Sequence, residues 1–494
     1  MNFTSTRSKQ SVTSAEAITK GLSADGGLFV PTSFPKFTAD EINALIDLDY
    51  KGRAELVLKK YLTDFTDDEI TYCVNGAYTD KFDDNIPAPL KQVSVGENIL
   101  ELWHGPTCAF KDMALQLLPY LLTTSAKKVA KGKTMVILVA TSGDTGKAAL
   151  DGFANVPNTK IIVFYPEDGV SPMQKLQMTT QEGDNVAVCA IKGNFDDAQT
   201  GVKQIFGDSE MAKYLEDMNM EFSSANSINF GRLVPQVVYY VSAYCDLVKS
   251  GRIALGDKFN VVVPTGNFGN ILAAYYAKQM GIPIAKLVCA SNKNNVLTDF
   301  INSGKYNKNR DFYTTSSPSM DILISSNLER LLYELYDHDE AEIAKLMNEL
   351  TTDGEYTVSD EVKAKINAEF YGGFCDEKGT ADTIKEHFGK YHYLCDTHTA
   401  VAVKVYEDYV KETGDKTVSV IASTASPYKF SHSVLPCIYD GAAPSDEFET
   451  VDKLNEVSGL AIPSSLKALK TKPVLHKTSV DKSQMRDFIK GFLG

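Results

Sequence analysis

Short apolar runs rich in β-branched residues recur along the chain, and each is followed by turn residues and a helical pattern of apolar positions. Strands that are buried on both faces have this character, and parallel neighbours need helical connections between them. The pattern therefore predicts an α/β fold with parallel sheets. The expected strands span residues 135–140, 161–164, 186–190, 261–263 and 417–422.

The spacing of apolar residues changes between about 320 and 390. Leucine and isoleucine recur there three and four positions apart with acidic residues between them, which predicts amphipathic helices. We expect a helical insertion in this region and a helix-rich domain over residues 1–95. The remaining residues are predicted to form a large catalytic domain and a small α/β lobe, made respectively of residues 96–130 with 251–494 and of residues 131–250.

One lysine stands between a turn and the start of a predicted helix. Gly105-Pro106 interrupts regular structure, and apolar residues then recur at helical spacing, at Ala114, Leu117, Leu118 and Leu121. Lys111 is therefore expected near a helix N-terminus, facing whatever the turn encloses. An ordinary surface lysine is the competing interpretation, because lysine side chains are mostly exposed.

Two glycine-rich turns join predicted strands to predicted helices. They are Thr141-Ser142-Gly143-Asp144-Thr145-Gly146 and Pro264-Thr265-Gly266-Asn267-Phe268-Gly269-Asn270. Backbone N–H groups at such helix N-termini, together with the helix dipole, attract anions. The first turn has Thr141 and Ala148 where a Walker A motif needs Gly and Ser or Thr. The second has only the last two glycines of a dinucleotide fingerprint.

Composition and charge favour a globular protein and argue against nucleic-acid-binding and membrane-spanning proteins. The 494 residues carry a formal net charge of −14, with 43% hydrophobic and 23% charged residues, which is typical of a globular protein of two or three domains. The negative charge argues against nucleic acid or an anionic membrane as a partner. Proline, glycine and asparagine interrupt the longest uncharged run, residues 259–277, so no membrane span is predicted. Residues 1–11 lack the apolar core of a secretory signal, and we expect a cytoplasmic location.

The cysteines and histidines give no metal-binding pattern. The eight cysteines are scattered without a C-x-x-C pair, which favours reduced, buried thiols. The seven histidines show no spacing such as H-E-x-x-H. His392 and His398 near Asp396 are compatible with a metal cluster, but a hydrogen-bonded role in a loop or core is favoured, and no metal is predicted.

Taken together, the lysine segment and the glycine turns resemble the threonine synthase family, whose members are fold-type II enzymes dependent on pyridoxal phosphate (PLP). With these three, the similar segments in family order are 5–7 with 22–31, 104–116, 141–149, 193–199, 226–232, 264–270, 396–400 and 423–430. The resemblance implies a tryptophan synthase β-like fold with two parallel-sheet lobes, an N-terminal helical region and a helical insertion.

The resemblance also implies which residues bind PLP. Lys111 would form the Schiff base and then act as the catalytic base. Thr424 would donate a hydrogen bond to the pyridine nitrogen, which makes the ring a softer electron sink than an aspartate would. The cofactor phosphate would be held where small residues let backbone N–H groups approach an anion, at Gly266, Asn267, Phe268, Gly269 and Asn270.

The implied reaction converts O-phospho-L-homoserine and water to L-threonine and phosphate by γ-elimination and β-addition, as the last step of threonine biosynthesis. Its substrate carries two anionic groups. The amino acid part would be held by Thr141, Ser142, Gly143, Asp144 and Thr145, and the substrate phosphate by Asn226, Ser227, Asn229 and Arg232. The role of Asp144 stays open, since many fold-type II enzymes have asparagine there and a carboxylate repels a phenolate unless a proton is shared.

Two other functions remain open at this point. A serine or threonine dehydratase, or a β-replacing lyase of the same fold, needs no second phosphate site, so the segment from Asn226 to Arg232 is the discriminating feature. A regulatory protein that binds PLP or a nucleotide without catalysis is the other alternative, and the presence of Lys111 argues against it. The sequence does not decide between a monomer and a homodimer.

Overall fold

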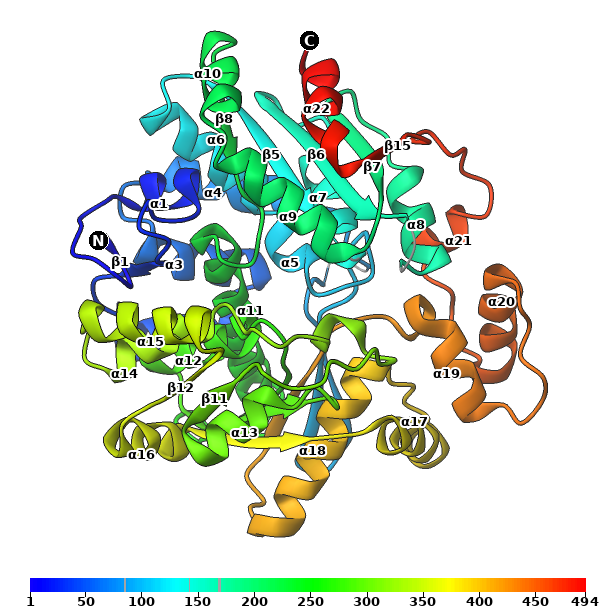
Figure 1. Ribbon diagram of the computed structural model, residues 1–494. Coiled ribbons are helices and arrows are strands. Elements are labelled where there is room, and N and C mark those ends of the chain that lie inside the picture. The colour runs from blue at the N-terminus through cyan, green and yellow to red at the C-terminus, as the bar shows by residue number, and fades with distance from the viewer. Residues whose placement is uncertain (84–85, 142, 168–169) are drawn as a thin grey trace.

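The computed structural model describes residues 1–83, 86–141, 143–167 and 170–494, which form two main sheets surrounded by helices (Figure 1). The larger sheet has the order β13 (Phe370–Phe374), β10 (Ile284–Ser291), β9 (Phe259–Pro264), β14 (Ser419–Ser423), β4 (Glu97–Glu101) and β3 (Leu90–Ser94). Its pairs are parallel except for the antiparallel pair of β3 and β4. The smaller sheet is parallel throughout, with the order β15 (Ser479–Asp481), β7 (Val186–Lys192), β6 (Thr159–Pro166), β5 (Thr134–Ala140) and β8 (Met220–Ser223).

The five strands predicted from apolar runs are all confirmed, as β5, β6, β7, β9 and β14. The predicted α/β fold is confirmed with them. The predicted insertion does contain helices, but it also contributes the edge strand β13, which the sequence did not indicate. This strand includes Gly372 and Gly373, which are poor strand formers, and its register comes from pairing with β10.

Helices cover both faces of the two sheets. In chain order they are α1 (Ser14–Lys20), α2 (Ala39–Asp47), α3 (Tyr50–Tyr61), α4 (Asp67–Ala77), α5 (Asp112–Leu115), α6 (Leu118–Val129), α7 (Asp144–Phe153), α8 (Pro172–Thr179), α9 (Phe195–Phe206), α10 (Ser209–Asp217), α11 (Phe230–Lys249), α12 (Gly269–Gln279), α13 (Val296–Ser303), α14 (Leu328–Leu335), α15 (Glu340–Thr352), α16 (Asp360–Glu369), α17 (Glu377–Tyr391), α18 (Thr397–Thr413), α19 (Ser431–Ile438), α20 (Glu447–Ser458), α21 (Ser464–Ala468) and α22 (Met485–Leu493). Two short two-stranded sheets add β1 (Phe3–Ser5) with β2 (Phe29–Pro31) and β11 (Lys305–Asn307) with β12 (Glu355–Thr357).

Each sheet buries alternate residues against different helices, as the two-residue period of a strand requires. In β5, Val136 and Leu138 pack with residues of α9, α10 and α22, whereas Ile137 and Val139 join the main core on the other face. In β9, Val262 packs with residues of α18, and its neighbours Val261 and Val263 join the core that includes α11 and α12. Both faces of the strands are therefore apolar.

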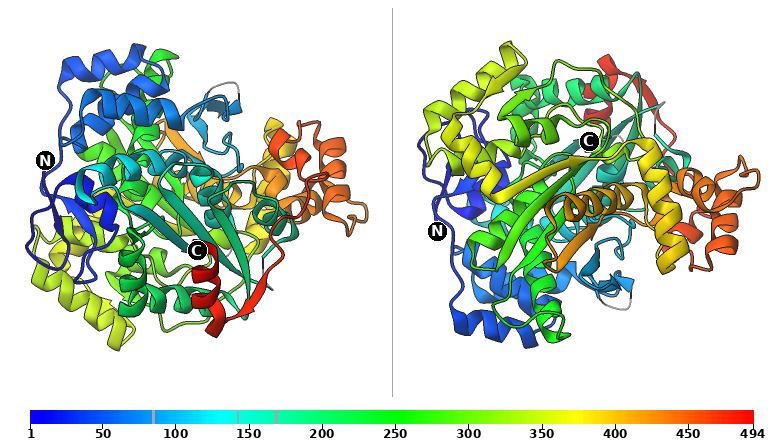
Figure 2. Two further views of the ribbon diagram at one scale, coloured as in Figure 1. Left: turned by 90° about the horizontal axis from the view of Figure 1, so that it is seen from above. Right: turned by 90° about the horizontal axis from the view of Figure 1, so that it is seen from below.

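The C-terminal segment returns to the smaller sheet. The sequence-based division placed residues 251–494 with the large domain, yet β15 pairs in parallel with β7, and α22 packs in the cluster beside that sheet. Figure 2 shows this segment, in red, along the edge of the smaller sheet. The chain end thus connects the two lobes. Among the residues described, no helix is long and apolar enough to cross a bilayer.

Candidate active site

Four of the segments singled out by the sequence follow strands of the two sheets at their carboxyl ends. The Lys111 segment follows β4, the first glycine turn follows β5, the second glycine turn follows β9, and Thr424 follows β14. Because parallel strands end at the same edge of a sheet, ligands of open α/β folds bind at this edge. The fold thereby gathers segments that are far apart in the sequence.

The turn before Lys111 is held by Asp112. The backbone N–H and the hydroxyl of Thr107 donate to the two carboxylate oxygens of Asp112, at 2.8 and 2.7 Å. A Cβ atom on Gly105 would lie 2.6 Å from the Asp112 side chain, so the turn has room only for glycine. Lys111 is the N-cap residue of α5, as predicted.

Backbone contacts fix the lysine segment against the residues that follow β14. Phe110 N donates to Thr424 O at 2.8 Å, and Ser426 N donates to Cys108 O at 3.1 Å. These bonds place Lys111 and Thr424 in one locally rigid unit.

The Lys111 amine lies in a nearly closed, polar environment. Its Nζ is 3.4 Å from Asp144 Oδ2 and 3.3 Å from Ser319 Oγ, and its side chain is 11% exposed. Burial lowers the pKa of Lys111; Asp144 opposes this effect, and the positive charges of Lys429 and Arg232 add to it. A lysine with a lowered pKa has a larger neutral, nucleophilic fraction near pH 7.

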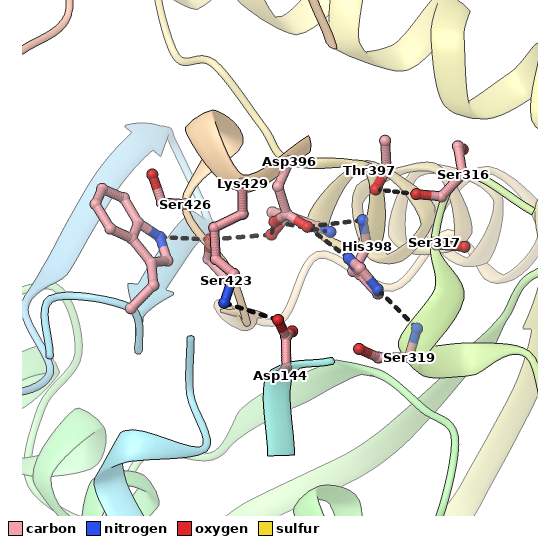
Figure 3. A network of polar contacts seen from close by, with 12 residues as sticks. Asp144, Ser316, Ser317, Ser319, Asp396, Thr397, His398, Ser423, Ser426 and Lys429 are labelled. Carbon is pink, nitrogen blue, oxygen red and sulfur yellow. Dashed lines mark hydrogen bonds and ion pairs between the residues drawn. The ribbon is translucent and has the colours of Figure 1, made fainter. Parts of the chain in front are cut away.

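Asp144 has a second cationic partner that the sequence did not indicate. Lys429 Nζ is 2.7 Å from Asp144 Oδ1 (Figure 3). Gln174 Nε2 donates to the same oxygen at 2.9 Å. Burial alone would raise the pKa of Asp144, but the charges of Lys429 and Lys111 outweigh it and hold that pKa well below its usual range. Asp144 is therefore an ionised carboxylate at the N-terminus of α7, where the helix dipole also favours negative charge.

The first glycine turn is shaped by its own threonine. The Thr141 hydroxyl accepts hydrogen bonds from Gly143 N at 3.0 Å and Gly146 N at 2.9 Å. Gly143 has a φ of 145°, and a Cβ there would meet the Gln174 side chain at 2.4 Å. Thr145 is half-buried, and Ser142 lies outside the described residues. Thr141 thus supports the turn. Of the other residues predicted to bind the amino acid part of the substrate, Asp144 and Thr145 have polar side chains that the structure describes.

The second glycine turn leads into α12 and is held by the segment that precedes α14. Asn327 donates to Asn267 O from its backbone and from its side chain, at 3.1 and 3.0 Å, and Ser325 Oγ donates to Gly266 O at 2.6 Å. Phe268 adopts a left-handed backbone with φ 63°. Asn270 Oδ1 accepts from the hydroxyls of Tyr239 and Tyr240, which leaves its buried Nδ2 without a partner among the described residues.

The predicted phosphate segment begins α11. Asn229 caps this helix: its Oδ1 accepts from Gly231 N at 2.8 Å, and its Nδ2 donates to Ile18 O and Ser224 O. Its side chain is thus engaged within the fold, whereas Asn226 and Ser227 are half-buried beside it. Arg232 is buried, donates to Ala225 O at 2.6 Å, and has a buried Nε with no partner in the described part of the chain.

A loop that the sequence analysis did not select lies against Lys111. Ser319 Oγ accepts from Lys111 Nζ, and Ser319 N donates to His398 Nε2 at 3.2 Å. Since a backbone N–H can only donate, His398 carries its proton on Nδ1, which lies 2.9 Å from Asp396 Oδ1. The favoured hydrogen-bonded role of His398 is confirmed. Thr397 Oγ1 also donates to Ser316 O at 2.7 Å, so the start of α18 fixes this loop at two points (Figure 3).

Comparison with known proteins identifies the family. Family models match residues 2–78 (threonine synthase N terminus), 91–359 (pyridoxal-phosphate dependent enzyme) and 399–486 (threonine synthase, C-terminal). The chain belongs to the threonine synthase family of PLP-dependent enzymes. The predicted family, fold-type II fold and PLP dependence are therefore confirmed.

Individual relatives support the same family assignment. Threonine synthase from Schizosaccharomyces pombe is 38% identical over 85% of each chain. A PLP-bound threonine synthase structure from Brucella melitensis superposes with a TM-score of 0.88 at 36% identity, covering 100% of this chain and 98% of the other. Human threonine synthase-like 1 is 39% identical over 96% of this chain, which spans 63% of the length of that relative.

Proposed function

We propose that this chain converts O-phospho-L-homoserine and water to L-threonine and phosphate, with PLP as its cofactor. The relatives named threonine synthase support the reaction. The observation that carries the proposal is Arg232, a buried guanidinium whose charge acts on Lys111 and whose Nε lacks a partner among the described residues. A substrate phosphate supplies the anion that such a group needs.

The residues around Lys111 fit the cofactor. The buried Asn270 Nδ2 and the first N–H groups of α12 are donors suited to the cofactor phosphate. Lys111, the turn from Gly266 to Asn270 and the Thr424 hydroxyl would hold PLP. When bound, PLP withdraws electrons from the substrate carbon that carries the amino group.

Lys111 is the proposed group for proton transfer. Its neutral Nζ accepts a proton from a substrate carbon and returns it at a later step. The Ser319 hydroxyl accepts a hydrogen bond from this amine at 3.3 Å and so orients it.

Two sets of side chains would bind the substrate. The amino acid part would meet the first glycine turn, at Gly143, Asp144 and Thr145, with Thr141 supporting the turn from behind. The phosphate would meet Asn226, Ser227 and Arg232, while Asn229 holds the start of α11 in place. Ser142 keeps its proposed role from the resemblance alone.

The proposed partner is a small molecule, without nucleic acid. The net charge of −14 supports this view, because a polyanion would be repelled. A cytoplasmic location is supported by the cysteines, which are all free thiols.

The test compares Lys111→Ala with Lys147→Met, a control that removes another lysine with a mostly buried side chain. Protein loaded with PLP is assayed for phosphate release from O-phosphohomoserine and for keto-acid formation from serine and threonine. Lys111→Ala should lose activity by at least about a hundredfold, the usual contribution of a general base. Borohydride reduction of the wild type should attach pyridoxyl to Lys111. A wild-type preference for unphosphorylated serine or threonine would instead favour a dehydratase.

A further inference from the structure

A second lysine faces the same carboxylate as Lys111. Lys429 follows β14 in a short 3-10 helix, Pro427–Phe430, and its side chain is 0% exposed. Its Nζ is 2.7 Å from Asp144 Oδ1, whereas Lys111 Nζ is 3.4 Å from Asp144 Oδ2. The shorter and more deeply buried ion pair of Asp144 is thus with the lysine that the sequence analysis left unassigned.

The position of Lys429 is fixed by the same contacts that fix the Lys111 segment. Its Nζ donates to Thr107 O at 2.9 Å, inside the turn that precedes Lys111. The backbone bonds of Phe110 to Thr424 and of Ser426 to Cys108 hold the two segments in register. Lys429 therefore cannot leave Asp144 without disturbing the lysine turn itself.

The charges around Lys111 can be counted. Among the described residues, the charged groups with the largest effect on its amine are one carboxylate, Asp144, and two cations, Lys429 and Arg232. Because Lys429 and Asp144 form a neutral pair, a proton on Lys111 would add a buried positive charge with no carboxylate of its own. Burying such a charge is costly. The neutral amine is the form that the arrangement favours.

We infer that Lys429 is a positioning residue that occupies Asp144 so that Lys111 remains a neutral, nucleophilic amine. The inference rests on the proposed role of Lys111 in PLP binding. It also gives Asp144 a definite function, because the Asp144–Lys429 pair places a carboxylate in the site without placing a net charge there. The lowered pKa of Lys111, caused by burial and then by the balance of Asp144 against Lys429 and Arg232, agrees with this geometry.

The test measures the titration of Lys111 in the full-length chain freed of PLP. Competitive acetylation with acetic anhydride from pH 6 to 10, quantified by mass spectrometry of the Lys111 peptide, gives the midpoint directly. In Lys429→Met the midpoint should rise by about 1 pH unit, because a buried positive charge that shares a carboxylate with Lys111 disfavours its protonated form. In Asp144→Asn it should fall. The double variant Asp144→Asn/Lys429→Met should return to within about half a pH unit of the wild type, because both charges are removed together.

Two further variants separate charge from packing. Lys429→Arg keeps the positive charge and should leave the midpoint unchanged, and Lys147→Met removes a lysine of α7 that pairs with Asp151 and should also leave it unchanged. If Lys429→Met does not fold, Asp144→Asn is compared with the double variant. The Lys111 midpoint must then be higher in the double variant, because only that variant lacks the charge of Lys429. The pH at which the visible band of the PLP-loaded protein changes should follow the same order of variants.

Equal midpoints in the wild type and Lys429→Met, or in Asp144→Asn and the double variant, would overturn the inference and leave Lys429 a packing residue. The titration needs no turnover of O-phosphohomoserine. A failed substrate assay would therefore overturn the proposed reaction alone, and a failed titration would overturn the role of Lys429 alone.

Discussion

Arg232 and Arg330 are both buried arginines, but they differ in the hydrogen bonds that their guanidinium groups make. Arg330 donates from all three guanidinium nitrogens, to Phe29 O at 3.0 Å, Asn327 Oδ1 at 2.5 Å and Ile228 O at 2.6 Å. The Arg232 guanidinium donates only to Ala225 O among the described residues. Replacing each arginine by methionine, which keeps much of the volume, should therefore separate a ligand-binding role from a structural one.

The expected change in the free energy of unfolding of each variant follows from the burial and the hydrogen bonds of its arginine. Burial lowers the pKa of both arginines from 12.5 to about 10, and a difference of that size corresponds to ~3 kcal/mol held against each charged form. Arg232→Met removes this cost and leaves one buried carbonyl without its donor, at about 1–3 kcal/mol. The two effects nearly cancel. Arg330→Met removes the same cost but leaves two buried acceptors and one partly buried acceptor without their donors, so it should destabilise the fold by several kcal/mol.

For catalytic activity we expect a specific loss in Arg232→Met, the variant with the smaller effect on stability. Arg232→Met loses a charge-assisted contact to the substrate phosphate, worth about 1.5–3 kcal/mol, so kcat/KM for O-phosphohomoserine should fall by about tenfold to over a hundredfold. Bound PLP should be retained. Thermal melts, PLP content and phosphate release are measured on both variants. If Arg232→Met lost as much thermal stability as Arg330→Met, or released phosphate at the wild-type rate, Arg232 would be a structural residue and the substrate-phosphate site would be wrong.

Two further predictions concern the cofactor turn and acid stability. A Cβ on Gly266 would lie 2.6 Å from Ser319 O, whereas a Cβ on Gly269 has its nearest contact at 3.4 Å, on Asn327. Gly269→Val should therefore keep the fold by circular dichroism and weaken PLP binding through overcrowding worth about 1–3 kcal/mol, or roughly 5- to 150-fold; Gly266→Val should disturb the Ser319 loop as well. Unchanged PLP affinity in both would move the phosphate site elsewhere. The lowered pKa of Asp144 means that its ionised form adds stability above its ordinary pKa of 3.8 and loses that contribution as pH falls. The stability difference between wild type and Asp144→Asn should thus be constant from about pH 5 to 7 and shrink below about pH 4, and urea titrations in which it stays constant down to about pH 3 would contradict the ion pair.

The parts of this molecule that local patterns predict are those with a short-range physical cause. The strand runs at 135–140 and 261–263 are apolar because both sheet faces are covered, and Lys111 stands at a turn that only Gly105 can make. The same reasoning identified both glycine turns. Local patterns did not predict edge strand β13, because its register depends on pairing with β10, and a local pattern does not specify a partner strand.

The residues that sequence reasoning missed act through contacts between distant segments. Lys429 lies in a segment similar to the family, but only the fold brings its amine to Asp144. Ser319 lies at the boundary of the predicted insertion, and His398 was considered as a metal ligand. In the structure, Ser319 N donates to His398 Nε2 beside Lys111. A family resemblance can therefore point to a segment, but charge balance within the site becomes visible only from distances.

One face of α11 connects the two predicted phosphate sites. Arg232, Gln236, Tyr239 and Tyr240 recur at helical spacing, and Tyr239 OH joins Gln236 Oε1 to Asn270 Oδ1, at 3.0 and 2.8 Å. Arg232 Nε at the start of this face, and Nδ2 of Asn270 in α12, which the tyrosines contact, are both buried donors without a partner among the described residues. An unsatisfied buried donor costs about 1–3 kcal/mol, and a fold retains two of them most readily where ligands complete them. The proposed reaction requires two phosphates to be held, one on the cofactor and one on the substrate. A dehydratase needs only the cofactor phosphate site, so in a dehydratase no substrate phosphate would pair with Arg232 at the start of α11.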